Sequence, residues 1–231
     1  MKTTLTPDQI ESLRRIDACT LANVIESFQT RLRNDGFADG SVRCIFPRLS
    51  PMVGFAATMK IRGASPPTGA RAYVEHTDWW DHILSIPAPR VVVVQDVDSP
   101  PGLGAFLGEV HANILRALQC VGAVTNGSVR DVPAVENMGF PFFAGSLSVS
   151  HSYIHIVETG GPVEVGGLTV RPGDLLHGDV HGIQSIPVGI VPRIPEAAKA
   201  LLRRERALIA LCRSPEFSLE KLRAAVDAIP S

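Results

Sequence analysis

Apolar positions follow two different periods in the middle of the chain. Arg90–Asp96 contains four consecutive valines, a β-branched run that predicts a strand buried on both faces. After a loop rich in glycine and proline, apolar residues recur at helical spacing until a helix stop at Gly122. Ala123–Thr125 then predicts a second short strand. The apolar helical positions are Val110, Ile114, Ala117, Leu118 and Val121.

This order of strand, loop, helix and strand predicts two parallel strands joined by a right-handed crossover. Ligands of open parallel sheets bind beyond the carboxyl ends of the strands. The segments at those ends are Asp96–Glu109 and Asn126–Asp131. We therefore expect both segments at one edge of the sheet, where a binding site would lie.

Further elements are predicted on both sides of this unit. Thr6 and Gln9 can form a capping box for a helix that starts at Pro7, and a second helix begins near Thr20. We expect one α/β domain, with N-terminal helices at 6–30, a core at about 50–190 and C-terminal helices at about 195–229. The other predicted elements are a strand at Val53–Ile61, a hairpin of Val163–Val165 and Leu168–Val170, strands near Leu175–His177 and Gly182–Ile186, and helices at about Pro195–Cys212 and Leu219–Ile229.

Composition narrows the class of protein. The chain of 231 residues is 45% hydrophobic and 19% charged, with a formal net charge of -1, so it can bury a substantial core. No basic face or tail indicates nucleic-acid binding. No apolar run is long enough for a membrane span, and the N-terminus has no apolar signal region. We expect a cytoplasmic protein whose four scattered cysteines are reduced.

The first candidate for chemistry is the glycine-rich stretch Gly102–Glu109. Glycines before a helix expose backbone amides, and the helix dipole adds positive potential that suits a carboxylate or phosphate. The stretch is not a P-loop, and the spacing of Gly102, Gly104 and Gly108 misses the dinucleotide fingerprint by one residue. An ordinary turn between strand and helix remains the alternative.

The second candidate is Asn126–Asp131. Arg130 supplies a planar cation that suits a carboxylate, and Asp131 supplies a hard oxygen ligand for Mg²⁺ or Mn²⁺. Asp131 also precedes a short helical pattern that begins at Val132, so it can cap a helix instead. The two roles are compatible if one oxygen caps and the other faces the site.

Histidine, cysteine, serine and aromatic residues give weaker indications of a functional site. The histidine pairs His151/His155 and His177/His181 have zinc-like spacing only on a helix, and in strand-like sequence their members would lie ~13 Å apart. Cys120 is expected in the core, and no GxSxG motif indicates a serine nucleophile. Thr77–His82 is polar and aromatic, as a lid or a subunit contact would be. The histidines are His76, His82, His111, His151, His155, His177 and His181.

Four motifs in order resemble a known family. They are Gly108-Glu109, Gly122 to Asp131 ending in Arg130-Asp131, Pro172-Gly173-Asp174, and Asp179-Val180-His181-Gly182. Over roughly Thr20–Pro187 the chain resembles the RraA-like proteins. This family includes the regulator of ribonuclease E activity A and the 4-hydroxy-4-methyl-2-oxoglutarate/4-carboxy-4-hydroxy-2-oxoadipate aldolases. Asn126 replaces the aspartate usual before Gly127, and His181 departs from the acidic or small polar residue common at its turn.

The resemblance implies a fold and a site. The fold would be a swivelling β/β/α-type sandwich, assembled as a homotrimer or homohexamer with sites between subunits. Arg130 would hold the substrate carboxylate and Asp131 would bind Mg²⁺ or Mn²⁺. A glutamate of the neighbouring subunit's C-terminal helix, Glu205 or alternatively Glu196, would assist catalysis. Substrate would also contact the loop residues Leu103, Gly104, Ala105, Phe106, Leu107 and Gly108.

The leading functional hypothesis is a divalent-metal-dependent lyase, an aldolase or decarboxylase that acts on a small 2-oxo acid through a pyruvate enolate. A metal beside the carboxylate and 2-oxo group would stabilise that enolate. The alternative from another class is a non-catalytic regulator that binds a ribonuclease or helicase. A different enolate-forming reaction on the same scaffold is a third possibility.

Overall fold

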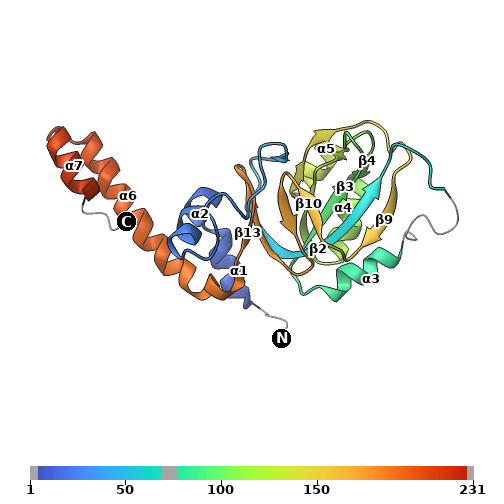
Figure 1. Cartoon of the computed structure of the whole chain (residues 1–231), viewed down its shortest axis with the longest axis horizontal. Coiled ribbons are helices and arrows are strands. Elements are labelled where there is room, and N and C mark those ends of the chain that lie inside the picture. Colours follow the sequence, from blue (N-terminus) through green and yellow to red (C-terminus); the bar gives the residue numbers. More distant parts are fainter. Residues whose placement is uncertain (1–4, 69–76, 228–231) are drawn as a thin grey trace.

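A mixed sheet forms the centre of the molecule (Figure 1). The computed structural model describes residues 5–68 and 77–227. The strands lie in the order β1-β7-β5-β3-β2-β12-β13, and β9 also pairs with β2. Strands β2, β3, β5 and β7 are mutually parallel, while β1, β12 and β9 pair antiparallel to their neighbours. The bounds are β1 Arg43–Cys44, β2 Met52–Arg62, β3 Arg90–Asp96, β5 Cys120–Thr125, β7 Phe142–Ala144, β9 His155–Thr159, β12 Leu175–Asp179 and β13 Gly182–Ile186.

Two smaller sheets accompany the central one. A parallel three-stranded sheet consists of β4 (Ala105–Leu107), β6 (Ser128–Val129) and β8 (Ser146–Leu147). Strands β10 (Val163–Val165) and β11 (Leu168–Val170) form the predicted hairpin. Strands β4 and β6 follow β3 and β5 in the chain, so the small parallel sheet continues from the carboxyl ends of the central strands.

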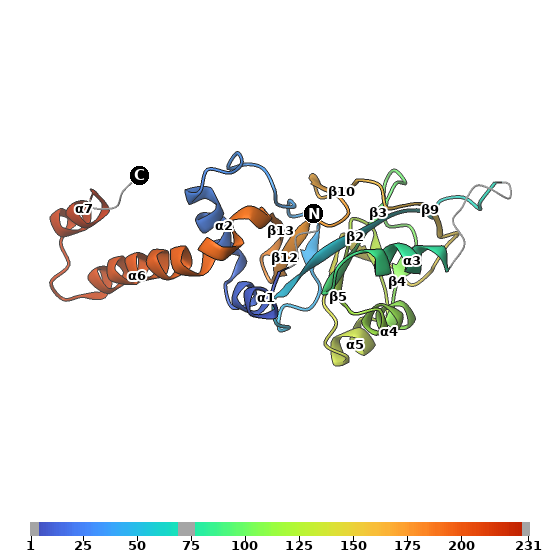
Figure 2. The same ribbon diagram turned by 90° about the horizontal axis from the view of Figure 1, so that it is seen from below.

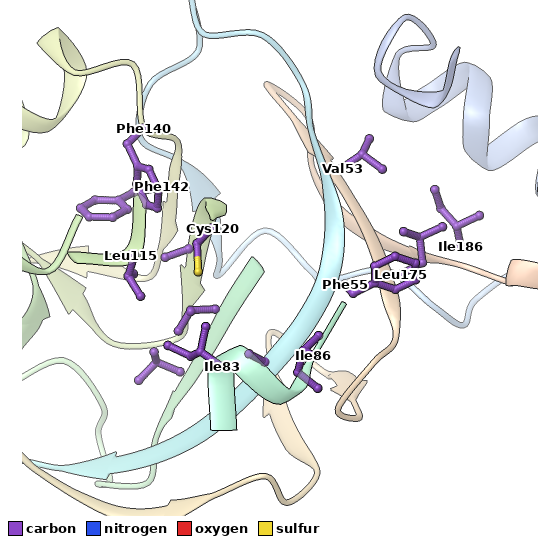
Figure 3. Packing of buried hydrophobic residues seen from close by; sticks show 14 of the residues in the cluster. Val53, Phe55, Ile83, Ile86, Leu115, Cys120, Phe140, Phe142, Leu175 and Ile186 are labelled. Atoms are coloured by element: carbon purple, nitrogen blue, oxygen red, sulfur yellow. The ribbon is translucent and has the colours of Figure 1, made fainter. Parts of the chain in front are cut away.

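The two faces of the central sheet have separate cores. Helices α3 (Asp78–Ser85), α4 (Glu109–Ala117) and α5 (Val132–Asn137) lie on one side, and β10 lies on the other (Figure 2). Val92 and Val94 of β3 belong to the larger core, whereas Val91 and Val93 pack in the core of the β10–β11 hairpin. The alternation of strand side chains therefore explains why a continuous valine run is needed here. Figure 3 shows part of the larger core.

The helices at the two ends of the chain lie on the β13 side of the molecule, with α7 farthest from the sheet (Figures 1 and 2). These are α1 (Pro7–Arg14), α2 (Ala18–Ser27), the 3-10 helix Val188–Arg193, α6 (Ile194–Arg213) and α7 (Leu219–Asp227). We call α6, α7 and the segment between them the C-terminal arm. Only Ile194 and Ala198 of α6 are buried, and no described residue of α7 is. In both whole-chain views the arm extends away from the sheet (Figures 1 and 2).

Most of the predicted elements are present, with shifts at particular boundaries. The capping box of Thr6 and Gln9 is confirmed. The second helix, predicted to begin near Thr20, begins at Ala18 because Asp17 caps it. The helix predicted to reach Val121 ends at Ala117, because Gln119 turns the chain with φ +58° and β5 starts at Cys120. No helix in the described part of the chain is long and apolar enough to cross a membrane.

Candidate functional site

The two segments predicted at one sheet edge do lie together. Strands β3 and β5 are parallel neighbours, and the Asn126 side chain bridges their ends. Its Oδ1 accepts a hydrogen bond from the Asp96 amide at 2.7 Å, and its Nδ2 donates to the Asp96 carbonyl at 2.9 Å. Beyond this bridge, Ala105 pairs with Ser128 and Leu107 with Val129. The expected shared edge is therefore confirmed.

Asp131 contacts the start of a different helix from the one it was expected to cap. It precedes α5, but its side chain makes no capping hydrogen bond there. Instead its Oδ2 accepts a hydrogen bond from the Glu109 amide at 3.1 Å, in the first turn of α4. The left-handed backbone of Asp131, with φ +56°, accompanies this arrangement. The prediction that Asp131 caps a helix is thus correct, but the helix is α4 and not α5.

Arg130 lies against the same carboxylate. Its amide donates to the Leu107 carbonyl at 3.0 Å, and its Nε is 3.3 Å from both Asp131 oxygens. The two side chains are 31% and 34% exposed, so each can meet a ligand. Within the described residues, the terminal guanidinium nitrogens of Arg130 have no hydrogen-bond partner. The pair borders a cavity of about 410 Å³ lined by Val129, Arg130, Asp131, Val132, Leu147, Ser148 and Val149.

The stretch from Leu103 to Gly108 reaches this pair at one end only. Leu103 is exposed, while Ala105, Phe106 and Leu107 are buried in β4. Gly108 packs directly against the pair, because a Cβ there would lie 2.5 Å from Asp131 Oδ2. The amide of Glu109 also belongs to the site, although Glu109 was not among the residues predicted to bind a ligand. The Gly-Glu start of the helix was the signal that could have identified it.

The two candidate glutamates lie far from this edge in their own chain. Both are in α6, which extends on the opposite side of the molecule from α4 and α5 (Figures 1 and 2). Glu196 is 74% exposed at its side chain and lies near Lys199 and Arg203. Glu205 is half-buried. Neither glutamate can complete the Arg130–Asp131 site of its own chain.

A buried carboxylate that the sequence analysis did not single out supports the loop. Asp96 is 2% exposed, and its Oδ2 accepts a hydrogen bond from the Gly102 amide at 2.7 Å. The Ser128 hydroxyl donates to the Gly102 carbonyl at 2.5 Å and also contacts Ser146. Both backbone groups of Gly102 are therefore held, and its φ of +95° suits glycine. The signal in the sequence was a lone acid at the end of an apolar strand.

Comparison with known proteins identifies the family. A family model described as Aldolase/RraA matches residues 21–184. The chain belongs to the RraA-like family. The match includes β3, α4, β5 and the Arg130–Asp131 pair, so it covers the whole edge described above. The resemblance of the sequence motifs to this family is confirmed.

Individual relatives are distant or partial. A Halalkalibacterium halodurans protein named "Putative 4-hydroxy-4-methyl-2-oxoglutarate aldolase" is 31% identical over 96 residues, covering 41% of this chain and 46% of that protein. An uncharacterized protein from Pseudomonas syringae has a TM-score of 0.73 at 22% identity, covering 97% of this chain and 96% of that one. Streptomyces coelicolor RraAS2, described as an unusual member of the RNase ES inhibitor RraA protein family, has a TM-score of 0.68 at 20% identity, covering 88% and 96%. These likenesses confirm the predicted α/β fold with C-terminal helices.

Asn126 stands where the RraA-like motif usually has an aspartate. The two hydrogen bonds between its side chain and the Asp96 backbone explain why an amide suits this position. An aspartate could accept from the Asp96 amide but could not donate to the Asp96 carbonyl. Its charge would also lie near the buried Asp96 carboxylate. We expect Asn126→Asp to lower the free energy of unfolding by about 1–3 kcal/mol in urea denaturation. Asn23→Asp, at an exposed position of α2, is the control, and equal stability of the two variants would contradict this role of the bridge.

The surroundings of the remaining candidate residues are typical of structural rather than catalytic side chains. Within the described residues no group of three or more acidic, histidine or cysteine side chains could hold a metal, and His76 lies outside them. Burial lowers the pKa of His177, whose Nε2 lies 2.9 Å from the Ile16 carbonyl, while His181 pairs with Asp179. Burial raises the pKa of Cys120 to about 12, as expected for a core thiol. Trp79 is buried against Phe106, which makes it a core residue rather than part of a lid.

Proposed function

We propose that this RraA-like protein is a divalent-metal-dependent lyase that cleaves or decarboxylates a small 2-oxo acid. The observation that carries the proposal is the pairing of Arg130 and Asp131 beside the first turn of α4, on the border of a cavity. Family membership and the named aldolase relative support the same class of reaction.

The substrate carboxylate would bind to Arg130. The terminal nitrogens of its guanidinium are available, and a planar fork suits two carboxylate oxygens. The positive end of α4 adds favourable potential at the same place. We propose that backbone groups of the stretch Leu103, Gly104, Ala105, Phe106, Leu107 and Gly108 also contribute to substrate binding. Gly108 is the strongest candidate among them because it contacts the pair directly.

Asp131 would hold the metal. Mg²⁺ commonly takes one or two protein carboxylates and fills its other positions with water and substrate, so a single half-exposed aspartate suits Mg²⁺ or Mn²⁺. A second carboxylate would come from the C-terminal arm of a neighbouring copy in a homotrimer or homohexamer. Glu205 is our first choice for that residue, with Glu196 as the alternative.

The roles of the side chains follow from charge. A divalent ion supplies a Lewis acid that stabilises the negative charge of a pyruvate enolate. Arg130 orients the carboxylate, so that the bond to be broken has a fixed position relative to Asp131. Asp131 or the neighbour's glutamate would assist proton transfer to the enolate.

Oxaloacetate decarboxylation tests this function. We expect purified protein to release pyruvate from oxaloacetate with Mg²⁺ or Mn²⁺ at a rate above that of the metal alone, and to lose this activity with a chelator. Arg130→Gln should raise KM strongly, while Arg43→Gln, at an exposed position distant in sequence from the site, should leave it unchanged. Turnover that does not depend on the metal, or that survives Arg130→Gln, would contradict the proposal.

A second candidate is regulation of a ribonuclease or helicase through protein binding. The family description covers both aldolases and RraA, and the arm exposes Ile209, Phe217, Leu219 and Val226. Such a role predicts binding to a ribonuclease that survives Arg130→Gln and is lost when the arm residues are replaced by polar ones. Binding to the nuclease without turnover of any 2-oxo acid would favour this candidate.

A further inference from the structure

A second cavity lies at the sheet edge opposite the Arg130–Asp131 pair. The parallel strands β2, β3, β5 and β7 begin at this edge, and we call the cavity the amino-edge cavity. Met52 and Cys120, the first residues of β2 and β5, line it together with Pro89 and Pro141, which directly precede β3 and β7. Its volume is about 480 Å³, within the range of about 300–1,000 Å³ typical of small-molecule pockets.

The wall of the amino-edge cavity is mostly apolar and mostly buried. The side chains that form it include Ile10, Met52, Val53, Cys120 and Phe140, and each of these residues is at least nine-tenths buried. The Cys120 thiol adds no charge at neutral pH, because burial raises its pKa to about 12. An aliphatic chain that enters the cavity therefore leaves water, and each buried methylene raises affinity roughly fourfold.

Two guanidinium groups line the same cavity, and the backbone holds both in place. Nε of Arg14 donates a hydrogen bond to the Pro51 carbonyl at 3.1 Å, and Nη2 of Arg116 donates to the Met138 carbonyl. Within the described part of the chain neither guanidinium makes another hydrogen bond, so the other N–H groups of each are available. A ligand that binds these groups loses less conformational entropy than one that must first order two free side chains.

The charge of the amino-edge cavity is positive. Among the described residues that line it, Arg14 and Arg116 are charged and none is acidic. Glu11 lies 3.7 Å from Nη1 of Arg14, but the two side chains are 49% and 44% exposed, so this surface pair attracts weakly. The metal and the neighbouring copy's glutamate proposed above belong to the opposite sheet edge and do not alter this charge.

We infer that the amino-edge cavity binds a small aliphatic anion whose carboxylate or phosphate head lies at Arg14 and Arg116. The aliphatic chain packs against Met52 and Val53. A guanidinium suits either head, because it can donate two parallel hydrogen bonds to two oxygens. This site shares no residue with the Arg130–Asp131 site, so it stands or falls independently of the proposed lyase function.

Calorimetry on the full-length protein tests the inference. The probes are butanoate, hexanoate and hexyl phosphate, and hexanol and hexylamine are controls that carry no negative charge. We expect hexanoate to bind about tenfold more tightly than butanoate, because two further methylenes are buried. Hexanoate or hexyl phosphate should bind about tenfold or more tightly than either control. Absence of binding by both anions, or equal binding of hexanol or hexylamine, would overturn the inference.

Arginine variants test the position of the anionic head. Arg14→Gln and Arg116→Gln should each weaken binding of the preferred anion by about tenfold or more, and both positions are exposed, so the melting temperature should change little. Arg206→Gln, at an exposed position of the C-terminal arm, should leave the affinity unchanged. Arg130→Gln should also retain binding, which separates this site from the proposed lyase site. Unchanged affinity in both cavity variants, or an equal loss in Arg206→Gln, would contradict the inference.

Methyl NMR tests the position of the aliphatic chain without a substitution in the cavity. Addition of the preferred anion should shift the methyl signals of Ile10 and Val53, which line the cavity, and leave that of Ile209 in the C-terminal arm unchanged. Shifts at Ile209 without shifts at Ile10 and Val53 would show that the anion binds elsewhere and would overturn the inference.

Discussion

Replacing Asp131 by alanine should abolish metal-dependent turnover, lowering kcat/KM roughly a thousandfold or more. The change removes the carboxylate expected to hold the metal and also the acceptor of the Glu109 amide at 3.1 Å. Oxaloacetate decarboxylation and metal binding by calorimetry measure the loss. Size-exclusion chromatography should give the same oligomeric state as the unmodified protein. Full residual activity would refute the assigned role of Asp131.

Asp131→Asn separates the two roles of this side chain. The amide oxygen can still accept from Glu109, so the start of α4 keeps its partner, but the negative charge is lost. We therefore expect metal affinity and turnover to fall nearly as far as in Asp131→Ala, while thermal stability changes less. If Asp131→Asn retains activity and Asp131→Ala does not, the carboxylate serves to hold α4 rather than a metal.

Among the substitutions predicted here, replacing Phe142 by alanine should cause the largest fall in the free energy of unfolding. The ring is fully buried, and its centroid lies 6.0 Å from that of Phe46 and 5.8 Å from that of Phe140. Figure 3 shows Phe140 and Phe142 next to each other in the larger core. Truncation leaves a cavity where β7, which lies between β1 and β5, meets the larger core. We expect the free energy of unfolding to fall by about 3–5 kcal/mol in guanidinium denaturation.

Phe217→Ala is the matched control for this truncation. The ring of Phe217 is 46% exposed in the C-terminal arm, so its removal should change monomer stability by less than about 1 kcal/mol. A loss in Phe217→Ala equal to that in Phe142→Ala would indicate that the arm is buried in solution, for example against a second copy. A small loss in Phe142→Ala would contradict the cavity argument.

Several elements could be predicted because their physical cause is local. The valines of β3 require an apolar environment on both faces, and this requirement alone indicates a central strand. Thr6 and Gln9 satisfy the amides of a helix that starts between them. The Gly166-Gly167 turn closes the β10–β11 hairpin because both glycines adopt positive φ.

Other features depend on contacts between distant segments. The α4 helix ends before its apolar stripe does, because Cys120 pairs with Arg90 in the sheet, and that pairing overrides helical spacing. The sequence marks Asp96 only by its place at the end of an apolar strand. Its structural role depends on the amides of Gly102 and Asp98, from which its carboxylate accepts hydrogen bonds. Patterns along the chain carry no information about such partners.

The sequence by itself determined the class of the fold, the parallel β3–β5 pair, the edge at which a ligand would bind, and Arg130 and Asp131 as candidate residues. These follow from periodicity, β-branched runs and motif order, which act over a few residues. Only the tertiary structure decided that Asp131 caps α4, that Gly108 rather than Leu103 contacts the pair, and that apolar side chains of the Leu147–Val149 segment line the cavity. The physical reason is that side-chain partners and cavity walls are set by packing between segments that are far apart in the chain.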